Sequence, residues 1–138
     1  MVDNDITLER IDRLLCFLPR FDVPRRTYAR WRGGEPAEDG AITTPYPGYE
    51  DDVLAFFMEA GQPWWSDYAY EPQRAWAMLQ DDRLIASCSP EEFKTLLTYC
   101  VRGERFGDGH WAHLLQTGRI VALLRRLAEL REGYAWSE

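Results

Sequence analysis

The sequence predicts an all-α or nearly all-α fold, with five to six helices in a single domain over residues 1–138. Apolar residues recur at the three-and-four spacing of one helical face in several separate segments. A Ser-Pro-Glu-Glu motif at residues 89–92 adds a strong helix-start signal. A chain of 138 residues with 46% hydrophobic residues fits one domain that buries a core.

The first helix is expected to begin after Asp5, which can cap it, and to end at Pro19. Its apolar face is formed by Leu8, Ile11, Leu14, Leu15 and Leu18. Residues 20–48 hold prolines and paired glycines but little periodicity, so we expect a long irregular or mobile segment there. Residues 20–45 leave room for a short β-hairpin within it.

A second helix is expected over residues 49–60, with Gly61 as its stop, and a third over residues 74–80. The fourth begins at Ser89, which can cap it while Glu92 reaches back to the capping residue. Glycines after residue 106 interrupt this helix. A short helix over residues 110–116 and a final helix after Gly118 follow, the last with the apolar stripe Ile120, Leu123, Leu124, Leu127 and Leu130.

The net charge of −7 is concentrated in the N-terminal part of the chain. Residues 1–82 hold 16 acidic and 8 basic side chains, whereas residues 83–138 hold 7 and 8. The negative electrostatic field of these residues repels phosphate backbones, so nucleic acid is not the expected partner. The same field is compatible with a basic protein as partner. Cys16, Cys88 and Cys100 are widely spaced, which indicates core residues rather than a disulfide framework or a zinc knuckle.

The chain has no apolar run long enough to span a membrane, and it does not open with a signal-peptide pattern. We therefore expect a cytoplasmic protein that does not contact a membrane.

Charged residues and histidines are concentrated between the fourth and last helices, at residues 102–113. The helical wheel places Glu104 on the buried side, so Glu104 and His110 are the candidates for proton transfer. Arg102 and Arg105 are three residues apart and, with Asp108 and His110, could form a small anion pocket. The alternative that we favour is a structural cluster in which these five residues bind one another.

A metal is not expected, because only His110 and His113 offer good ligands and a third is conjectural. The sequence has no nucleophile elbow, phosphate loop or dinucleotide fingerprint, so no cofactor is expected and an enzyme is the less favoured class.

Two groups of residues are candidates for an interaction surface. They are the aromatic residues Trp64, Trp65 and Tyr68 and the basic residues Arg25, Arg26 and Arg30. One of the adjacent tryptophans is expected at a surface, because the two cannot point the same way.

The run from Leu96 to Leu130 resembles a family of small, uncharacterised bacterial proteins with an R-x-x-R-F-x-x-G-H signature. Matching positions are Leu97, Thr98, Val101, Arg102, Arg105, Phe106, Gly109, His110 and Gly118. Weaker similarities at residues 64–67 and 82–86 extend the resemblance over roughly residues 46–131. The resemblance implies a single small domain of unknown function and indicates no activity.

The function that we expect is that of a small intracellular binding or regulatory module acting through protein interaction. One alternative is an enzyme or small-anion-binding protein that uses the cluster at residues 102–110. Another is an acidic inhibitor that mimics nucleic acid, or a nucleic-acid-associated protein. The sequence leaves open whether the chain forms a homodimer.

Overall fold

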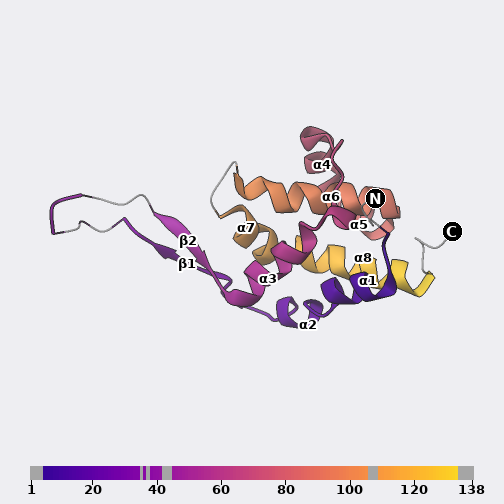
Figure 1. The fold of residues 1–138 in the computed structure, drawn as a ribbon, viewed down its shortest axis with the longest axis horizontal. Helices are drawn as coiled ribbons and strands as arrows, with labels where there is room; N and C mark the ends of the chain where they lie inside the picture. The colour runs from indigo at the N-terminus through magenta and orange to yellow at the C-terminus, as the bar shows by residue number, and fades with distance from the viewer. Residues whose placement is uncertain (1–4, 35, 37, 42–44, 106–108, 134–138) are drawn as a thin grey trace.

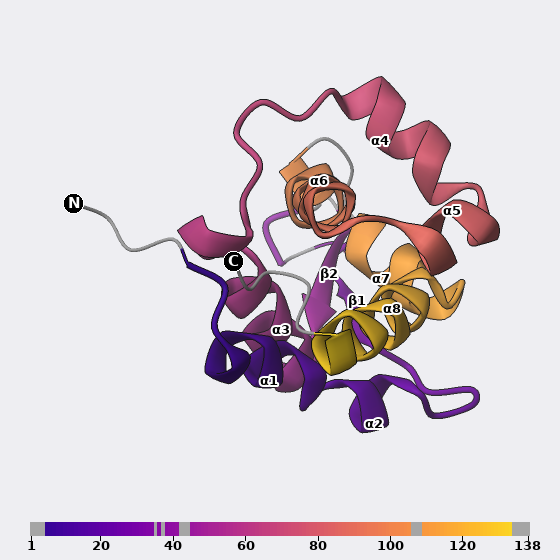
Figure 2. The ribbon, with the colours of Figure 1, turned by 90° about the vertical axis from the view of Figure 1, so that its right-hand side faces the viewer.

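Two helices from the C-terminal half, α6 (Pro90–Arg102) and α8 (Arg119–Gly133), form the centre of the fold. The computed structural model describes residues 5–34, 36, 38–41, 45–105 and 109–133, and shows shorter helices around these two (Figures 1 and 2). α8 contacts α1 (Leu8–Leu15), α2 (Leu18–Phe21), α5 (Asp82–Ser87) and α7 (His110–Gln116). α6 contacts α3 (Asp51–Ala60) and α4 (Pro72–Leu79). The chain is a mostly helical single domain, as the sequence predicts.

One continuous apolar core lies between these helices. The largest wholly buried side chains are Ile11, Leu14, Phe56, Trp65, Leu79, Ile85, Phe93, Leu96, Leu97, Ile120, Leu123 and Leu124. Burying each such side chain contributes about 1.5 to 3 kcal/mol before conformational entropy is counted. The core therefore depends on contacts between segments that are far apart in the sequence.

The strongest local signals place helix ends correctly. The amide of Glu92 donates to Ser89 Oγ at 3.1 Å, and the amide of Ser89 donates to Glu92 Oε1 at 2.9 Å, which completes the predicted capping box of α6. Gly61 ends α3. Gly118, with φ at +79°, makes the turn between α7 and α8.

Two helix predictions are wrong in detail. The first helix is capped by Thr7 rather than Asp5, because Thr7 Oγ1 accepts from the amide of Arg10 at 3.2 Å. Pro19 does not end this helix but lies in the first turn of α2, where a missing N–H costs little. The predicted third helix is α4, and a further helix, α5, follows it with Asp81 as its cap.

The strands β1 (Ala29–Arg32) and β2 (Tyr46–Tyr49) form a two-stranded antiparallel sheet in which Ala29 pairs with Tyr49 and Arg32 with Tyr46. We call the described residues between positions 29 and 49 the arm, because they project from the helical body (Figure 1). The predicted hairpin exists, but β2 lies beyond residue 45, where it was expected to end. The segment 20–48 is thus partly regular.

The cysteine prediction holds for two of the three residues. Cys88 and Cys100 are buried, and burial raises the pKa of both thiols. Cys16 is exposed at the end of α1, so its assignment to the core is wrong. Among the described residues, no helix has the length and apolar character needed to cross a membrane.

Candidate functional site

The carboxylate of Glu104 joins the arm to the C-terminal helices. Glu104 lies in the 3₁₀ turn η2 (Gly103–Arg105), directly after α6. The Tyr49 hydroxyl donates to its two oxygens at 2.8 and 2.9 Å. The amide of Gly109 donates to Oε2 at 3.0 Å, and the amide of Trp111 donates to Oε1 at 2.9 Å. Glu104 therefore caps the N-terminus of α7 from outside that helix.

We call Glu104 and the residues that donate to its carboxylate, namely Tyr49, Gly109 and Trp111, the Glu104 corner. Burial, together with the hydrogen bond to Glu104, raises the pKa of Tyr49 well above its ordinary value, so its hydroxyl stays protonated and donates. The Tyr49 and Trp111 rings are 5.4 Å apart, and Trp111 stacks on Phe57 at 4.2 Å. Trp111 Nε1 donates at 3.1 Å to two carbonyls at the end of α6. The corner thus connects the arm, α3, α6 and α7.

His110 lies beside this corner without a described partner for Nε2, which is buried. Its ring packs edge-on against Tyr99, and a Cβ atom on Gly103 would lie 2.1 Å from Nε2, so only glycine fits at residue 103. Burial lowers the pKa of His110, and the nearby Glu104 opposes this shift. The lowered pKa favours the neutral imidazole near pH 7.

The structure brings together only part of the predicted cluster. Glu104 is half-buried and lies in the turn after α6 rather than on a continued helix. The donors that surround its carboxylate are Tyr49 and backbone amides rather than Arg102 or His110. The Arg102 guanidinium instead lies over the rings of Tyr68 and Tyr70, at 5.7 and 5.4 Å. The side chain of Arg105 and all of Asp108 lie outside the described residues.

Sequence reasoning missed Tyr49 and Trp111. Tyr49 is 55 residues from Glu104, and nothing in its spacing marks it as a partner. His113 is exposed on α7. Within the described ranges, no group of three histidine, cysteine, aspartate or glutamate residues lies close enough to hold a metal ion.

The arm has two different faces, because side chains alternate along a strand. Arg30, Arg32 and Tyr46 share one face, where the Arg32 side chain covers Gly48 so closely that a Cβ there would lie 2.6 Å from Nε. Trp31 lies on the other face against Gly109, where a Cβ would be 2.9 Å from its ring. Trp31 is still 58% exposed and Tyr46 47%. Among the described residues, none pairs with Arg30 or Arg32.

The other predicted interaction residues divide into buried and exposed ones. Trp65 is wholly buried and packs against Phe93, so its assignment to a surface is wrong. Trp64 is partly buried beneath the guanidinium of Arg10, which lies 3.9 Å from its ring centroid. Tyr68 is 69% exposed.

The two remaining arginines also differ. Arg26 is half-buried and forms an ion pair with Asp52, which lowers the pKa of that carboxyl. Arg25 is exposed, with a backbone φ of 63° in the left-handed region. Arg25 is therefore the freer of these two guanidiniums.

Comparison with known proteins places the chain in one family. The model of the family described as a family of unknown function (DUF6508) matches residues 6–133, so the chain belongs to this family. The membership covers the arm, the Glu104 corner and all the helices. No curated protein and no solved structure matches the chain.

Proposed function

We propose that this protein is a binding module that acts through protein interaction, and that the arm is the element that contacts the partner. The observation that carries this proposal is the arm itself, which projects from the helical body (Figure 1). Two aromatic and two basic side chains of its strands are exposed. Tryptophan, tyrosine and arginine are the residue types that dominate binding energy at protein interfaces.

The backbone of the arm supports the same function. A two-stranded sheet leaves the outer edge of each strand without a strand partner, and an extended peptide can add to such an edge. The Glu104 corner fixes the base of the arm through Tyr49, at the end of β2. The arm is therefore held in place before it binds, which lowers the entropy cost of association.

The arginines on one face of the arm support a partner class, although the described arm as a whole also carries Glu38 and Asp39. Arg30 and Arg32 on one face select an extended segment that carries acidic side chains, because each guanidinium can bind a carboxylate in a bidentate manner. The net charge of −7 repels any anionic partner at long range, and it repels the dense charge of nucleic acid more strongly than a short acidic segment that meets the two arginines locally. The partner of the arm is accordingly an acidic protein segment.

The alternatives have less support. An enzyme at the Glu104 corner would need a carboxylate free to exchange protons, but both oxygens of Glu104 already accept hydrogen bonds. A nucleic-acid mimic would need the carboxylates of residues 35–82 arrayed on one face, and two of them are already engaged, Asp52 with Arg26 and Asp67 with Thr95.

Site-specific photo-crosslinking in living cells tests the proposal. A photoreactive phenylalanine analogue in place of Tyr46 should capture a defined protein, and the same analogue in place of the exposed Tyr68 on the body should not. Arg30→Glu combined with Arg32→Glu should abolish the capture and leave the circular dichroism spectrum unchanged. Equal capture from both positions, or capture of nucleic acid by the arm, would contradict the proposal.

A further inference from the structure

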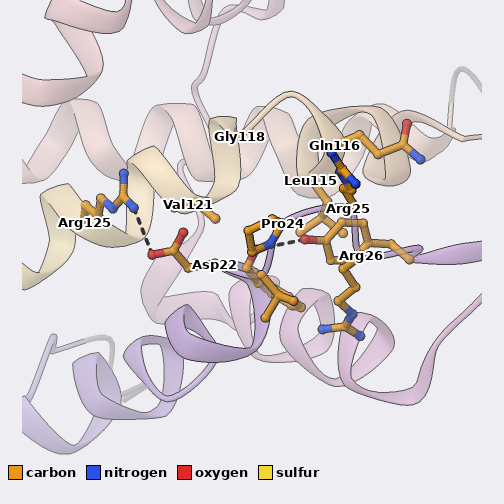
Figure 3. A pocket seen from close by; sticks show the side chains of 12 residues that line it. Asp22, Pro24, Arg25, Arg26, Leu115, Gln116, Gly118, Val121 and Arg125 are labelled. Atoms are coloured by element: carbon orange, nitrogen blue, oxygen red, sulfur yellow. Dashed lines mark hydrogen bonds and ion pairs between the residues drawn. The ribbon is translucent and has the colours of Figure 1, made fainter.

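A cavity of about 560 Å³ lies between the loop that follows α2 and the turn that joins α7 to α8. Figure 3 shows Asp22, Arg25 and Arg26 on the loop side and Gln116, Gly118 and Arg125 on the other side. Sites for small molecules in proteins commonly have volumes of about 300 to 1,000 Å³. We call this cavity the arginine pocket; it is separate from the Glu104 corner and from the exposed residues of the arm.

The charge of the arginine pocket is opposite to that of the chain. Three arginines (Arg25, Arg26 and Arg125) and a single carboxylate (Asp22) line it. Arg26 is paired with Asp52 behind the lining and Arg125 with Asp22, so Arg25 contributes the uncompensated positive charge. The first turn of α8, which borders the pocket, carries no acidic side chain. A positive pocket in a protein of net charge −7 attracts an anion to one particular place.

The three arginines are not equally available. Arg26 donates to Asp52 and to the carbonyl of Arg20, so its guanidinium is already bound. Arg125 donates to Asp22 at 2.9 Å, but both side chains of this pair are at least half exposed, and such pairs are weak. Arg25 has no hydrogen-bond or ion-pair partner within the described part of the chain. Its guanidinium is therefore the one that an incoming anion would meet first.

The backbone at Arg25 adds to this interpretation. Its φ of 63° lies in the left-handed region, which costs a residue with a side chain about 1 kcal/mol or more relative to glycine. Arg25 thus occupies a position that favours glycine for stability. The side chain brings no described contact that would offset this cost in the absence of a ligand.

We propose that the arginine pocket binds the phosphate group of a small phosphorylated molecule. A phosphate monoester carries about −1.5 to −2 charges at pH 7, and guanidinium groups bind phosphate oxygens in a bidentate manner. Arg25 offers one uncompensated guanidinium, and Arg125 can exchange its exposed pair with Asp22 for a phosphate oxygen. The volume exceeds what a phosphate ion alone would fill. Val23, which is 46% exposed, contributes apolar surface at the edge of the pocket for the organic part of the ligand.

Titration of the full chain, followed by amide chemical shifts, tests this site. The probes are inorganic phosphate, glycerol phosphate and succinate at matched ionic strength, with chloride as the reference salt. We expect saturable shifts for residues 22–28 and 115–121 with both phosphate probes, and half-saturation below about 10 mM. Succinate, a dianion of different geometry, should bind more weakly.

Two substitutions of Arg25 separate binding from folding. Arg25→Gly suits the left-handed backbone, so the variant should be at least as stable as the wild type and should bind phosphate at least about tenfold more weakly. Arg25→Lys keeps the charge and should retain part of the affinity. Arg83→Ala removes an exposed arginine elsewhere, on α5, and should leave binding unchanged.

The proposal is overturned if phosphate causes no saturable shifts in these segments, or if Arg25→Gly binds phosphate as tightly as the wild type. Tighter binding of succinate than of either phosphate probe would also overturn it, because the ligand class would then be wrong. Substitution of Arg30 and Arg32 in the arm should leave phosphate binding unchanged. A failure of the phosphate titration can therefore be told apart from a failure of the crosslinking test of the protein partner.

Discussion

Removal of the Glu104 carboxylate should destabilise the protein strongly. In Glu104→Ala, the Tyr49 hydroxyl and the amides of Gly109 and Trp111 lose their acceptor. A hydrogen bond to a charged group contributes about 1.5 to 3 kcal/mol, but Glu104 is only half-buried, so water replaces part of each interaction. We therefore expect the free energy of unfolding to fall by about 2 to 4 kcal/mol for the three donors together.

Urea denaturation followed by circular dichroism measures this loss. Glu104→Gln should fall between the wild type and Glu104→Ala, because its NH₂ group must face one of the two backbone amides, which are also donors. The control is Glu132→Ala, an exposed glutamate on α8, which should change the free energy of unfolding by less than about 0.5 kcal/mol.

A double-mutant cycle with Tyr49→Phe tests the partner assignment. Tyr49→Phe removes one donor and leaves the two amides bound to Glu104, so it should cost about 1 kcal/mol. In the Glu104→Ala background the same change should cost much less, since its acceptor is already absent. If Glu104→Ala were as stable as Glu132→Ala, or if the two losses simply added, the role assigned to this carboxylate would be refuted.

Three further predictions concern residues beside this carboxylate. Gly103→Ala should cost about 1 to 3 kcal/mol in urea denaturation, because its Cβ would overlap the His110 ring, and His110→Ala in the same chain should recover part of the loss. Burial lowers the pKa of His110 in the folded chain. As pH falls below about 6.5, the imidazole of His110 is therefore protonated in the unfolded chain while it is still neutral in the folded chain. The free energy of unfolding should therefore decrease from pH 7 to pH 5, and His110→Gln should flatten this dependence, which urea denaturation at both pH values would measure. Trp111→Phe should cost about 1 to 2 kcal/mol by leaving two carbonyls of α6 without their indole donor, a loss that a thermal melt would detect and an unchanged midpoint would contradict.

The features that the sequence predicted best are those set by neighbouring residues. The capping box of Ser89 and Glu92 forms between groups three residues apart, so its sequence pattern is nearly sufficient to place the start of α6. The stop at Gly61 and the turn at Gly118 are local for the same reason. The apolar stripe of the last helix predicted five of the six buried residues of α8, because the helical period determines which side chains share a face, and it missed Val121.

Two local sequence patterns were each compatible with two structures, and packing against the rest of the chain selected one of them. Pro19 can end one helix or lie in the first turn of the next, since its missing N–H is harmless only in a first turn. Adjacent Trp64 and Trp65 had to point in different directions, but only the packing against Phe93 decided that Trp65 is the buried one.

The candidate sites depended almost wholly on tertiary structure. The helical wheel predicted an inward Glu104 by continuing the fourth helix, but α6 ends at Arg102 and Glu104 lies in the following turn η2, where it is half-buried. The wheel could not name Tyr49, which reaches Glu104 only because β2 ends beside the α6–α7 turn. The arginine pocket likewise joins a loop to a turn that lies about ninety residues further along the chain. The sequence by itself determined helices, their caps and their buried faces, whereas the pairing of distant side chains required the packed fold, since no local interaction encodes which segments meet.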